Sequence, residues 1–311
     1  MLNFKLKKTL FSYRHGLYFI EYVLAKICIH FCRLLTPEQA SNLGGWICRT
    51  IGPFLPQSEI ADKNLLLAMP ELSACERKLM IKKIWEHLGR IVCEFPHINQ
   101  LQENTTEGAG WEIIGSNYLT EHAKKNGAVL FFSGHIGNWE MLPPGVARYG
   151  MPFSSFFRAA SNPYVNQLIL HLRYEAMGGE IPMFPKGATG ARQALKHVLQ
   201  GNRLGVLSDQ KMNDGVELQF FGQPAMTSSA VASLALRLQC PIIPGYVERL
   251  GPARLRIVVE PPIDYTSFNQ NKPENIRKLT QVINDTLEKW IRKNPEQWLW
   301  LHKRWPNKFY H

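Results

Sequence analysis

The chain has 311 residues, of which 45% are hydrophobic and 20% are charged, and these values exclude a disordered chain. Its 36 Lys and Arg residues outnumber 25 Asp and Glu residues, which gives a net charge of +11. A basic surface suits an anionic membrane, an acidic protein or a nucleic acid. Zinc-finger spacing and RNA-recognition aromatics are missing from the sequence, so no nucleic acid is expected as a partner. The six cysteines stand apart, which predicts free thiols in a reducing compartment and no metal site.

The N-terminus begins with a basic stretch and continues as a mostly apolar segment, residues 16–35. Its length would just cross a bilayer of about 30 Å, yet Glu21, Lys26, His30 and Arg33 interrupt it. A charge at mid-bilayer costs about 2.5–3.5 kcal/mol, and the three basic residues are spaced to share one face of a helix. This pattern predicts a helix that lies in the membrane interface. The alternative is a buried helix of a globular protein.

Three units are expected along the chain. Residues 1–35 form the basic start and the membrane-associating helix, residues 36–110 form a helical segment, and residues 111–311 form a core packed with it. Helical spacing of apolar residues in the second unit predicts three helices, with prolines near their ends: Thr36–Ile51, Ser58–Ala68 and Ser73–Phe95.

From about Trp111 the pattern changes to short apolar runs that alternate with helical stretches. The runs predict strands at Ala128–Phe132, Leu204–Leu207, Ile242–Val247 and Leu255–Val259. The stretches predict helices at Pro163–Met177, Ala188–Leu199, Ser228–Leu238 and Glu274–Lys293. Such alternation indicates an α/β fold, with a largely parallel sheet flanked by helices and preceded by the helical membrane-associating segment.

The most informative stretch is AVLFFSGHIGNWE, residues 128–140, in which an apolar strand leads into His135. Ligands bind at the carboxyl ends of strands in open α/β sheets, and a histidine there can act as a general base. Glu140 follows five residues later, about 140° away on a regular helix, so the two side chains meet only if the chain turns irregularly. Gly137 and Asn138 tolerate such a turn.

This pair predicts transfer of an acyl group. An alcohol at neutral pH must lose its proton as it attacks a thioester carbonyl. His135 would take that proton on one ring nitrogen, and Glu140 would hold the N–H of the other, as in a catalytic triad whose serine is replaced by the acceptor hydroxyl. No metal and no organic cofactor is required. A capping or core histidine beside an unrelated acid is the alternative for so short a pattern.

Longer stretches support the chemical interpretation. SGHIGNWE, FFGQPAMTSSAVASLALR and PEQWLWLHKRW closely resemble the bacterial lipid A biosynthesis (lauroyl/myristoyl) acyltransferase family, part of the wider His-x4-Asp/Glu acyltransferase superfamily. NLLLAMPELS, WEHLGRIVCEFPHI and GVLSDQ match it as well, so that the resemblance runs from about Asn64 to Trp305. The family's dyad falls on His135 and Glu140.

The resemblance implies an enzyme of the bacterial inner membrane that faces the cytoplasm and meets its anionic surface. The acyl donor would be an acyl carrier protein thioester, and the acceptor a hydroxyl of a lipid A precursor. An acyltransferase for another glycolipid or for an ornithine lipid remains an alternative. A membrane scaffold without catalytic turnover is another.

Four further residues are candidate substrate-binding positions: Asn138, Arg158, Arg173 and Asp209. Either arginine could bind a phosphate or hold an oxyanion, and the family has an arginine that matches Arg173. Asp209 follows the strand at Leu204–Leu207 and is expected to pair with Arg173 or to orient the acceptor, unless it is a structural turn residue.

Two more features bear on the site. Lys186 and Gly187 precede a predicted helix and would meet an anionic head group. Pro143 and Pro144 make a continuous helix through Glu140 doubtful. Either a short turn carries the dyad and a new helix starts at the prolines, or the position of Glu140 is altered.

Overall fold

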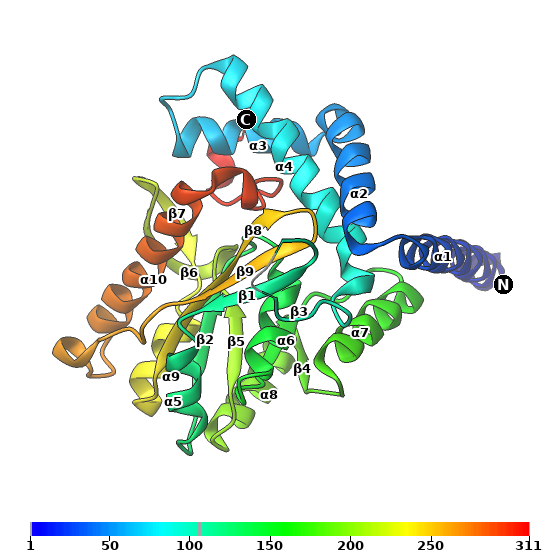
Figure 1. Cartoon of the computed structure of the whole chain (residues 1–311). Coiled ribbons are helices and arrows are strands. Elements are labelled where there is room, and N and C mark those ends of the chain that lie inside the picture. The colour runs from blue at the N-terminus through cyan, green and yellow to red at the C-terminus, as the bar shows by residue number, and fades with distance from the viewer. Residues whose placement is uncertain (1, 105–106, 311) are drawn as a thin grey trace.

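A central twisted sheet with helices on both faces forms the body of the protein (Figure 1). The computed structural model describes residues 2–104 and 107–310. The strands of the main sheet are β1 (Gly110–Ile114), β2 (Leu130–Ser133), β3 (Ser154–Phe157), β4 (Met183–Pro185), β5 (Leu204–Leu207), β8 (Ile242–Gly251) and β9 (Arg254–Val259). A separate hairpin consists of β6 (Lys211–Phe220) and β7 (Gln223–Thr227).

The main sheet has the strand order β1-β9-β8-β2-β5-β3-β4. Strands β8, β2, β5, β3 and β4 run parallel to their neighbours in that series. Strand β9 pairs antiparallel with β8, and β1 pairs parallel with β9. The predicted α/β fold with a largely parallel sheet is therefore confirmed, with β9 and β1 reversed at one edge. The carboxyl ends of β2, β3, β4 and β5 meet at one side of the sheet.

The two faces of the sheet are covered by different helices. On one face Phe132 of β2 and Tyr246 of β8 stack on Trp290, at ring-centroid distances of 5.5 and 4.7 Å. Trp290 belongs to α10 (Pro273–Lys293), which shares this core with α8 (Ala188–Leu199) and α9 (Ala230–Leu238). On the opposite face Phe131 and Ile243 pack beneath α5 (Ser116–Ala123) and α6 (Leu142–Ala147).

The helical N-terminal segment agrees with its prediction within about two residues. Its helices are α2 (Pro37–Ile51), α3 (Gln57–Ala68) and α4 (Ala74–Glu94). Thr36 and Ser73 cap α2 and α4 with complete capping boxes, which satisfy backbone N–H groups at both starts. Gly44 and Gly89 let these helices touch, since a Cβ on Gly89 would lie 2.1 Å from the Gly44 carbonyl oxygen.

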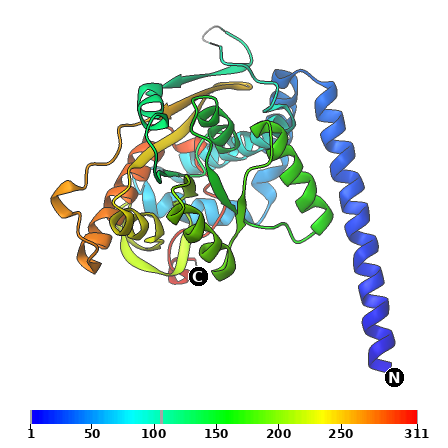
Figure 2. The same ribbon diagram turned by 90° about the horizontal axis from the view of Figure 1, so that it is seen from below.

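Helix α1 (Leu2–Leu34) lies along one side of the body, and its amino-terminal end projects past it (Figure 2). It contacts α7 (Pro163–Met177) through the Arg33–Glu175 ion pair of 2.5 Å. Asn162 also donates to the Tyr18 carbonyl oxygen at 2.7 Å while it caps α7.

Apolar side chains of α1 face outward, which does not fit the alternative of a buried helix of a globular protein. The exposed ones are Leu17, Phe19, Ile20, Val23, Leu24, Ile27, Phe31 and Leu34. Among the described residues, none of the helices combines the length and the apolar character needed to cross a bilayer. The side chains of the basic start, with Lys5, Lys7 and Lys8, lie outside the described part.

Candidate active site

His135 and Asp209 form a hydrogen-bonded pair at the carboxyl edge of the sheet. His135 follows β2, and Asp209 follows the neighbouring strand β5. Nδ1 of His135 lies 2.8 Å from Asp209 Oδ1, and the His135 backbone N–H donates to Oδ2 at 2.8 Å. Because Asp209 is fully buried, its carboxylate fixes the ring with Nδ1 as donor and leaves Nε2 as the basic nitrogen.

Asp209 stays ionised in this position. Burial alone would raise its pKa, but the charge of His135 and its hydrogen bonds outweigh burial and hold the pKa well below the usual range. Trp298 adds a third donor, with its indole N–H 2.7 Å from Oδ2. An anion with three donors is the arrangement that stabilises an imidazolium formed at His135.

The turn after β2 is fastened to the C-terminal segment. The amide of Leu299 donates to the His135 carbonyl oxygen at 3.1 Å, and Gly137 donates to the Gln297 carbonyl oxygen at 3.0 Å. Gly137 has φ 56°, and a Cβ there would lie 1.8 Å from the Val247 carbonyl oxygen. Only glycine fits this position, so backbone geometry fixes where the imidazole points.

Glu140 does not hold the ring of His135. Its two oxygens accept from Arg173 Nη2 at 2.6 Å and Arg173 Nε at 2.9 Å. The prediction of a His135–Glu140 contact is therefore corrected. The chain passes through Gly137 into a 3-10 turn at Trp139–Met141, which directs Glu140 towards α7, where Arg173 lies.

The same geometry shows how the chain accommodates Pro143 and Pro144 after Glu140. Helix α6 begins at Leu142, directly after the 3-10 turn, and Pro143 and Pro144 occupy its first turn, where a missing N–H costs no hydrogen bond. A short turn thus carries Glu140 and a new helix starts at the prolines, which is the first of the two alternatives. The Arg173–Glu140 pair is largely shielded, with side chains 26% and 15% exposed.

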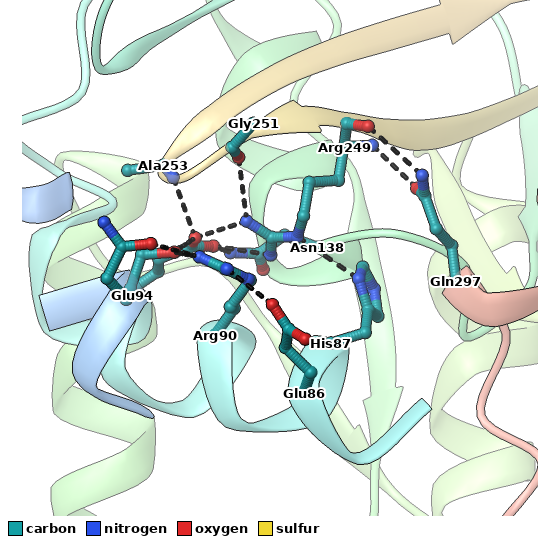
Figure 3. A network of polar contacts seen from close by, with 11 residues as sticks. Glu86, His87, Arg90, Glu94, Asn138, Arg249, Gly251, Ala253 and Gln297 are labelled. Carbon is teal, nitrogen blue, oxygen red and sulfur yellow. Dashed lines mark hydrogen bonds and ion pairs between the residues drawn. The ribbon is translucent and has the colours of Figure 1, made fainter. Parts of the chain in front are cut away.

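Asn138 lies within the protein and belongs to a buried polar network (Figure 3). It donates to Glu94 Oε2 of α4 at 2.8 Å. Glu94 also forms a bidentate ion pair with Arg249 of β8, one bond of which measures 2.7 Å. Ser41 and the amide of Ala253 donate to the same carboxylate, at 2.6 and 3.0 Å. The expected contact of Asn138 with substrate has no support in this placement, because its side chain is fully covered.

This network joins three parts of the fold. Arg249 donates to His87 of α4 at 3.2 Å, and Gln297 bonds both the amide and the carbonyl of Arg249. Burial would raise the pKa of Glu94, but Arg249 outweighs burial and lowers it. The buried carboxylate of Glu94 is therefore shared by three parts of the fold: the helical segment, the β8–β9 end of the sheet and the turn after His135.

Lys186 lies near the exposed side of His135, and Arg158 lies near Lys186. Arg158 directly follows β3 and is exposed, and Lys186 directly follows β4. Lys186 Nζ donates to Gln210 Oε1, and Gln210 Nε2 lies 3.4 Å from His135 Nε2. Burial first, and then the charge of Arg158, lower the pKa of Lys186. The carboxyl ends of β3 and β4 thus contribute two neighbouring cations, of which Lys186 is linked to the base through Gln210.

Trp298 and His302 are site residues that the prediction missed. The ring of His302 lies 6.2 Å from that of His135 and 6.3 Å from that of Trp298. Burial lowers the pKa of His302 to about 4, so it is neutral at pH 7. Both residues lie in the stretch PEQWLWLHKRW, which resembles the family, but its spacing alone does not predict a contact with His135. The pairing of Asp209 with Arg173, one of the expectations for this residue, is wrong, since Asp209 holds His135 and Arg173 binds Glu140. A role of Asp209 in orienting the acceptor stays a prediction.

A hollow of about 350 Å³ lies at the other end of the strands, lined by residues that include Lys125, Ser154, His197 and Arg203. Most of its lining residues come just before β2, β3 and β5 in the chain or at their first residues. The hollow therefore opens at the amino ends of these strands. Its lining does not include His135, so it is separate from the candidate site.

A family of known proteins matches almost the whole chain. The model of the family described as bacterial lipid A biosynthesis acyltransferase matches residues 6–307. The chain belongs to this family. The E. coli K12 lipid A biosynthesis palmitoleoyltransferase is 25% identical over 275 residues, which cover 84% of this chain and 83% of that protein. The E. coli K12 lipid A biosynthesis lauroyltransferase is 24% identical over 257 residues, 80% of this chain and 78% of that protein.

A relative with a different named acceptor also matches. The phosphatidylinositol mannoside acyltransferase of Mycobacterium tuberculosis H37Rv is 25% identical over 181 residues. The aligned part covers 58% of this chain and 54% of that protein, so the chain spans about half the length of this relative.

Proposed function

We propose that this member of the lipid A acyltransferase family transfers a fatty acyl group from an acyl carrier protein thioester to a hydroxyl of a lipid A precursor. The observation that carries the proposal is the 2.8 Å contact between His135 Nδ1 and the buried Asp209. It leaves a basic nitrogen at the exposed side of the ring, where strand ends gather ligand-binding residues.

In the proposed reaction His135 is the general base and Asp209 holds its ring. Nε2 takes the proton of the acceptor hydroxyl as the oxygen attacks the thioester carbon. Asp209 stabilises the resulting imidazolium through its bond to Nδ1. The imidazolium then protonates the departing thiolate, so the base returns to its starting form without a metal or a cofactor.

Glu140 has a different role in this proposal. Its bidentate bond holds Arg173 on α7 at the edge of the site. A guanidinium fixed by one carboxylate keeps other N–H groups for an anionic substrate. Exposed Arg158 would bind a phosphate from the same side. Both arginines then select an anionic acceptor or donor.

The membrane is the proposed location of the reaction. The exposed apolar side chains of α1, together with Arg14 and Lys26 on the same helix, suit a helix in the interface of an anionic membrane. We place the enzyme at the cytoplasmic face of the bacterial inner membrane, where the carrier protein would deliver the acyl chain.

The test is acyl transfer by the purified full-length protein from several acyl carrier protein thioesters to a lipid A precursor. Native protein should form the acylated product, and His135→Ala should reduce turnover by about 10²–10⁴-fold while the protein stays folded. A His135→Ala protein with the native rate would overturn the proposed mechanism. Folded native protein that acylates no lipid A precursor would overturn the acceptor.

A second acceptor class is favoured by one observation, the similarity to a phosphatidylinositol mannoside acyltransferase. The same base and thioester chemistry would then act on a mannoside hydroxyl. Parallel assays with both acceptors separate the two, because the specificity is the ratio of their kcat/KM values.

A further inference from the structure

Gln210 and Lys186 form a chain of hydrogen bonds that ends at the basic nitrogen of His135. Because Nδ1 donates to Asp209, Nε2 of His135 is an acceptor, and the Gln210 amide nitrogen lies 3.4 Å from it. The Gln210 oxygen accepts from the Lys186 ammonium. The amide therefore occupies the position next to the base that an attacking hydroxyl must take.

Acyl transfer also requires hydrogen-bond donors for the negative charge that develops on the carbonyl oxygen. The backbone amides of residues 135–137 are already used. That of His135 donates to Asp209, that of Ile136 to the Gly134 carbonyl, and that of Gly137 to the Gln297 carbonyl. These three amides are not free to donate, so side chains beside the base become candidates for the donors.

Lys186 has a charge available for this purpose. In the described part of the chain it forms no salt bridge, and its ammonium donates to the neutral side-chain amide of Gln210. Arg158 lies close enough to lower the pKa of Lys186. The carboxylate that acts on Lys186 is that of Asp209, which opposes this lowering, and its oxygens are already held by three donors. An ammonium group that faces another cation and forms no ion pair of its own is placed to accept an anion.

We propose that Gln210 and Lys186 together bind the oxyanion of the tetrahedral intermediate, as catalytic residues of the acyl transfer proposed above, on which this inference rests. The acceptor hydroxyl displaces the Gln210 amide from His135 Nε2. The freed amide N–H and the Lys186 ammonium then point at the carbonyl oxygen of the thioester.

The hydroxyl oxygen bonds to the thioester carbon, its proton passes to His135 Nε2, and the carbonyl electron pair moves to the oxygen held by Gln210 and Lys186. That pair re-forms the carbonyl as the carbon–sulfur bond breaks. The sulfur leaves as thiolate and takes the proton from His135, which gives an ester and a thiol.

Steady-state kinetics of the full chain in detergent micelles test the inference. Gln210→Ala and Lys186→Met should each lower kcat by about 10²–10³-fold, as loss of an oxyanion donor does, with little change in KM for the donor thioester. Lys186→Arg retains the cation and should recover much of the lost rate. Lys196→Met removes an exposed lysine of α8 and should leave kcat unchanged.

The pH profile provides a second readout. Lys186 acts only as the ammonium. Burial and the charge of Arg158 lower its pKa against the opposing charge of Asp209, so kcat should decline as pH rises through that pKa. Arginine stays charged throughout this range, so Lys186→Arg should lack the decline. A structural role for Lys186 would not move this limb of the profile.

Three outcomes would overturn the inference. One is a native kcat for Gln210→Ala, and another is a raised KM at native kcat for Lys186→Met, which would make Lys186 a ground-state anion site. The third is the same pH profile for Lys186→Arg and native protein. If Gln210→Ala fails to fold, Gln210→Glu is used instead. It has the same size but lacks the amide N–H, so it should lose kcat as well, and a native kcat for it would overturn the inference. His135→Ala is assayed in parallel. If His135→Ala is inactive while Gln210→Ala keeps the native kcat, this inference alone is rejected. If His135→Ala keeps the native kcat, the proposed function is rejected.

Discussion

Asn138 donates a hydrogen bond to Glu94 at 2.8 Å, and this bond ties the turn that carries His135 to helix α4. Glu94 is fully buried and ion-paired with Arg249. Asn138, which directly follows Gly137, is thereby held by Glu94, which lies 44 positions earlier in the chain.

We expect Asn138→Asp to destabilise the protein more than Asn138→Ala does. The aspartate places a second buried carboxylate against Glu94, at a cost of about 3–5 kcal/mol in the free energy of unfolding. Alanine removes one donor and should cost about 1–3 kcal/mol. Denaturant unfolding measures both, and Asn42→Ala, at the exposed rim of the same network, should stay within about 0.5 kcal/mol of native. Equal losses for the two Asn138 variants would contradict the assignment.

Asp209→Asn should reduce kcat by about 10²–10⁴-fold with a small effect on substrate KM. The amide can present its N–H to Nδ1 and favour the wrong tautomer, which leaves Nε2 protonated. Steady-state rates check this, with circular dichroism to show that the variant is folded. An Asp209→Asn enzyme at half the native rate would remove the aspartate from the mechanism.

Glu140 and Arg173 should behave as one unit in a double-mutant cycle. Glu140→Gln and Arg173→Gln each break the bidentate pair, so the double variant should be little slower than either single one. The expected coupling energy is about 1–3 kcal/mol, calculated from kcat/KM. Additive effects would show that Glu140 acts on His135 or substrate independently of Arg173.

Stability should decline at acid pH because of two buried carboxylates. Asp209 and Glu94 have folded-state pKa values below their ordinary ones. Their contribution is therefore complete above an unfolded-state pKa of about 4 and is lost as pH falls through the lower folded-state values. The melting temperature should drop below about pH 4, with a shallower drop for Asp209→Asn. Exposed Asp214→Asn should retain the native slope, and a native slope in Asp209→Asn would refute the linkage.

Much of the fold was readable because local patterns agree with the tertiary structure. Helices Pro163–Met177 and Ala188–Leu199 and strand Leu204–Leu207 have their predicted bounds. The hairpin β6–β7 and the short strands β1 and β4 were missed. Strand β6 has ten residues but most of them are exposed or half-buried, and β1 and β4 are short, so none of these strands shows a clear apolar periodicity. The reversal of β9 was missed too, because strand direction depends on pairing rather than on the run itself.

The site was only partly predictable for a related reason. His135 follows from its place after an apolar strand, but its partner Asp209 lies 74 positions away and meets it through the β2–β5 pairing. Glu140 was favoured by proximity in sequence, and the left-handed Gly137 turned it away. The burial of Glu94 could have been predicted, since it lies three positions after Ile91 on the apolar face of α4.

The contacts of α1 with α7 bear on how the protein is prepared. Asn162 caps the helix that carries Arg173 and also bonds Tyr18 and Glu21 of α1. A truncated protein made for better solubility by deleting α1 would strip these partners from α7 and loosen the support of Arg173. A preparation that retains α1 and replaces its outward apolar side chains by polar ones would gain solubility without disturbing that support.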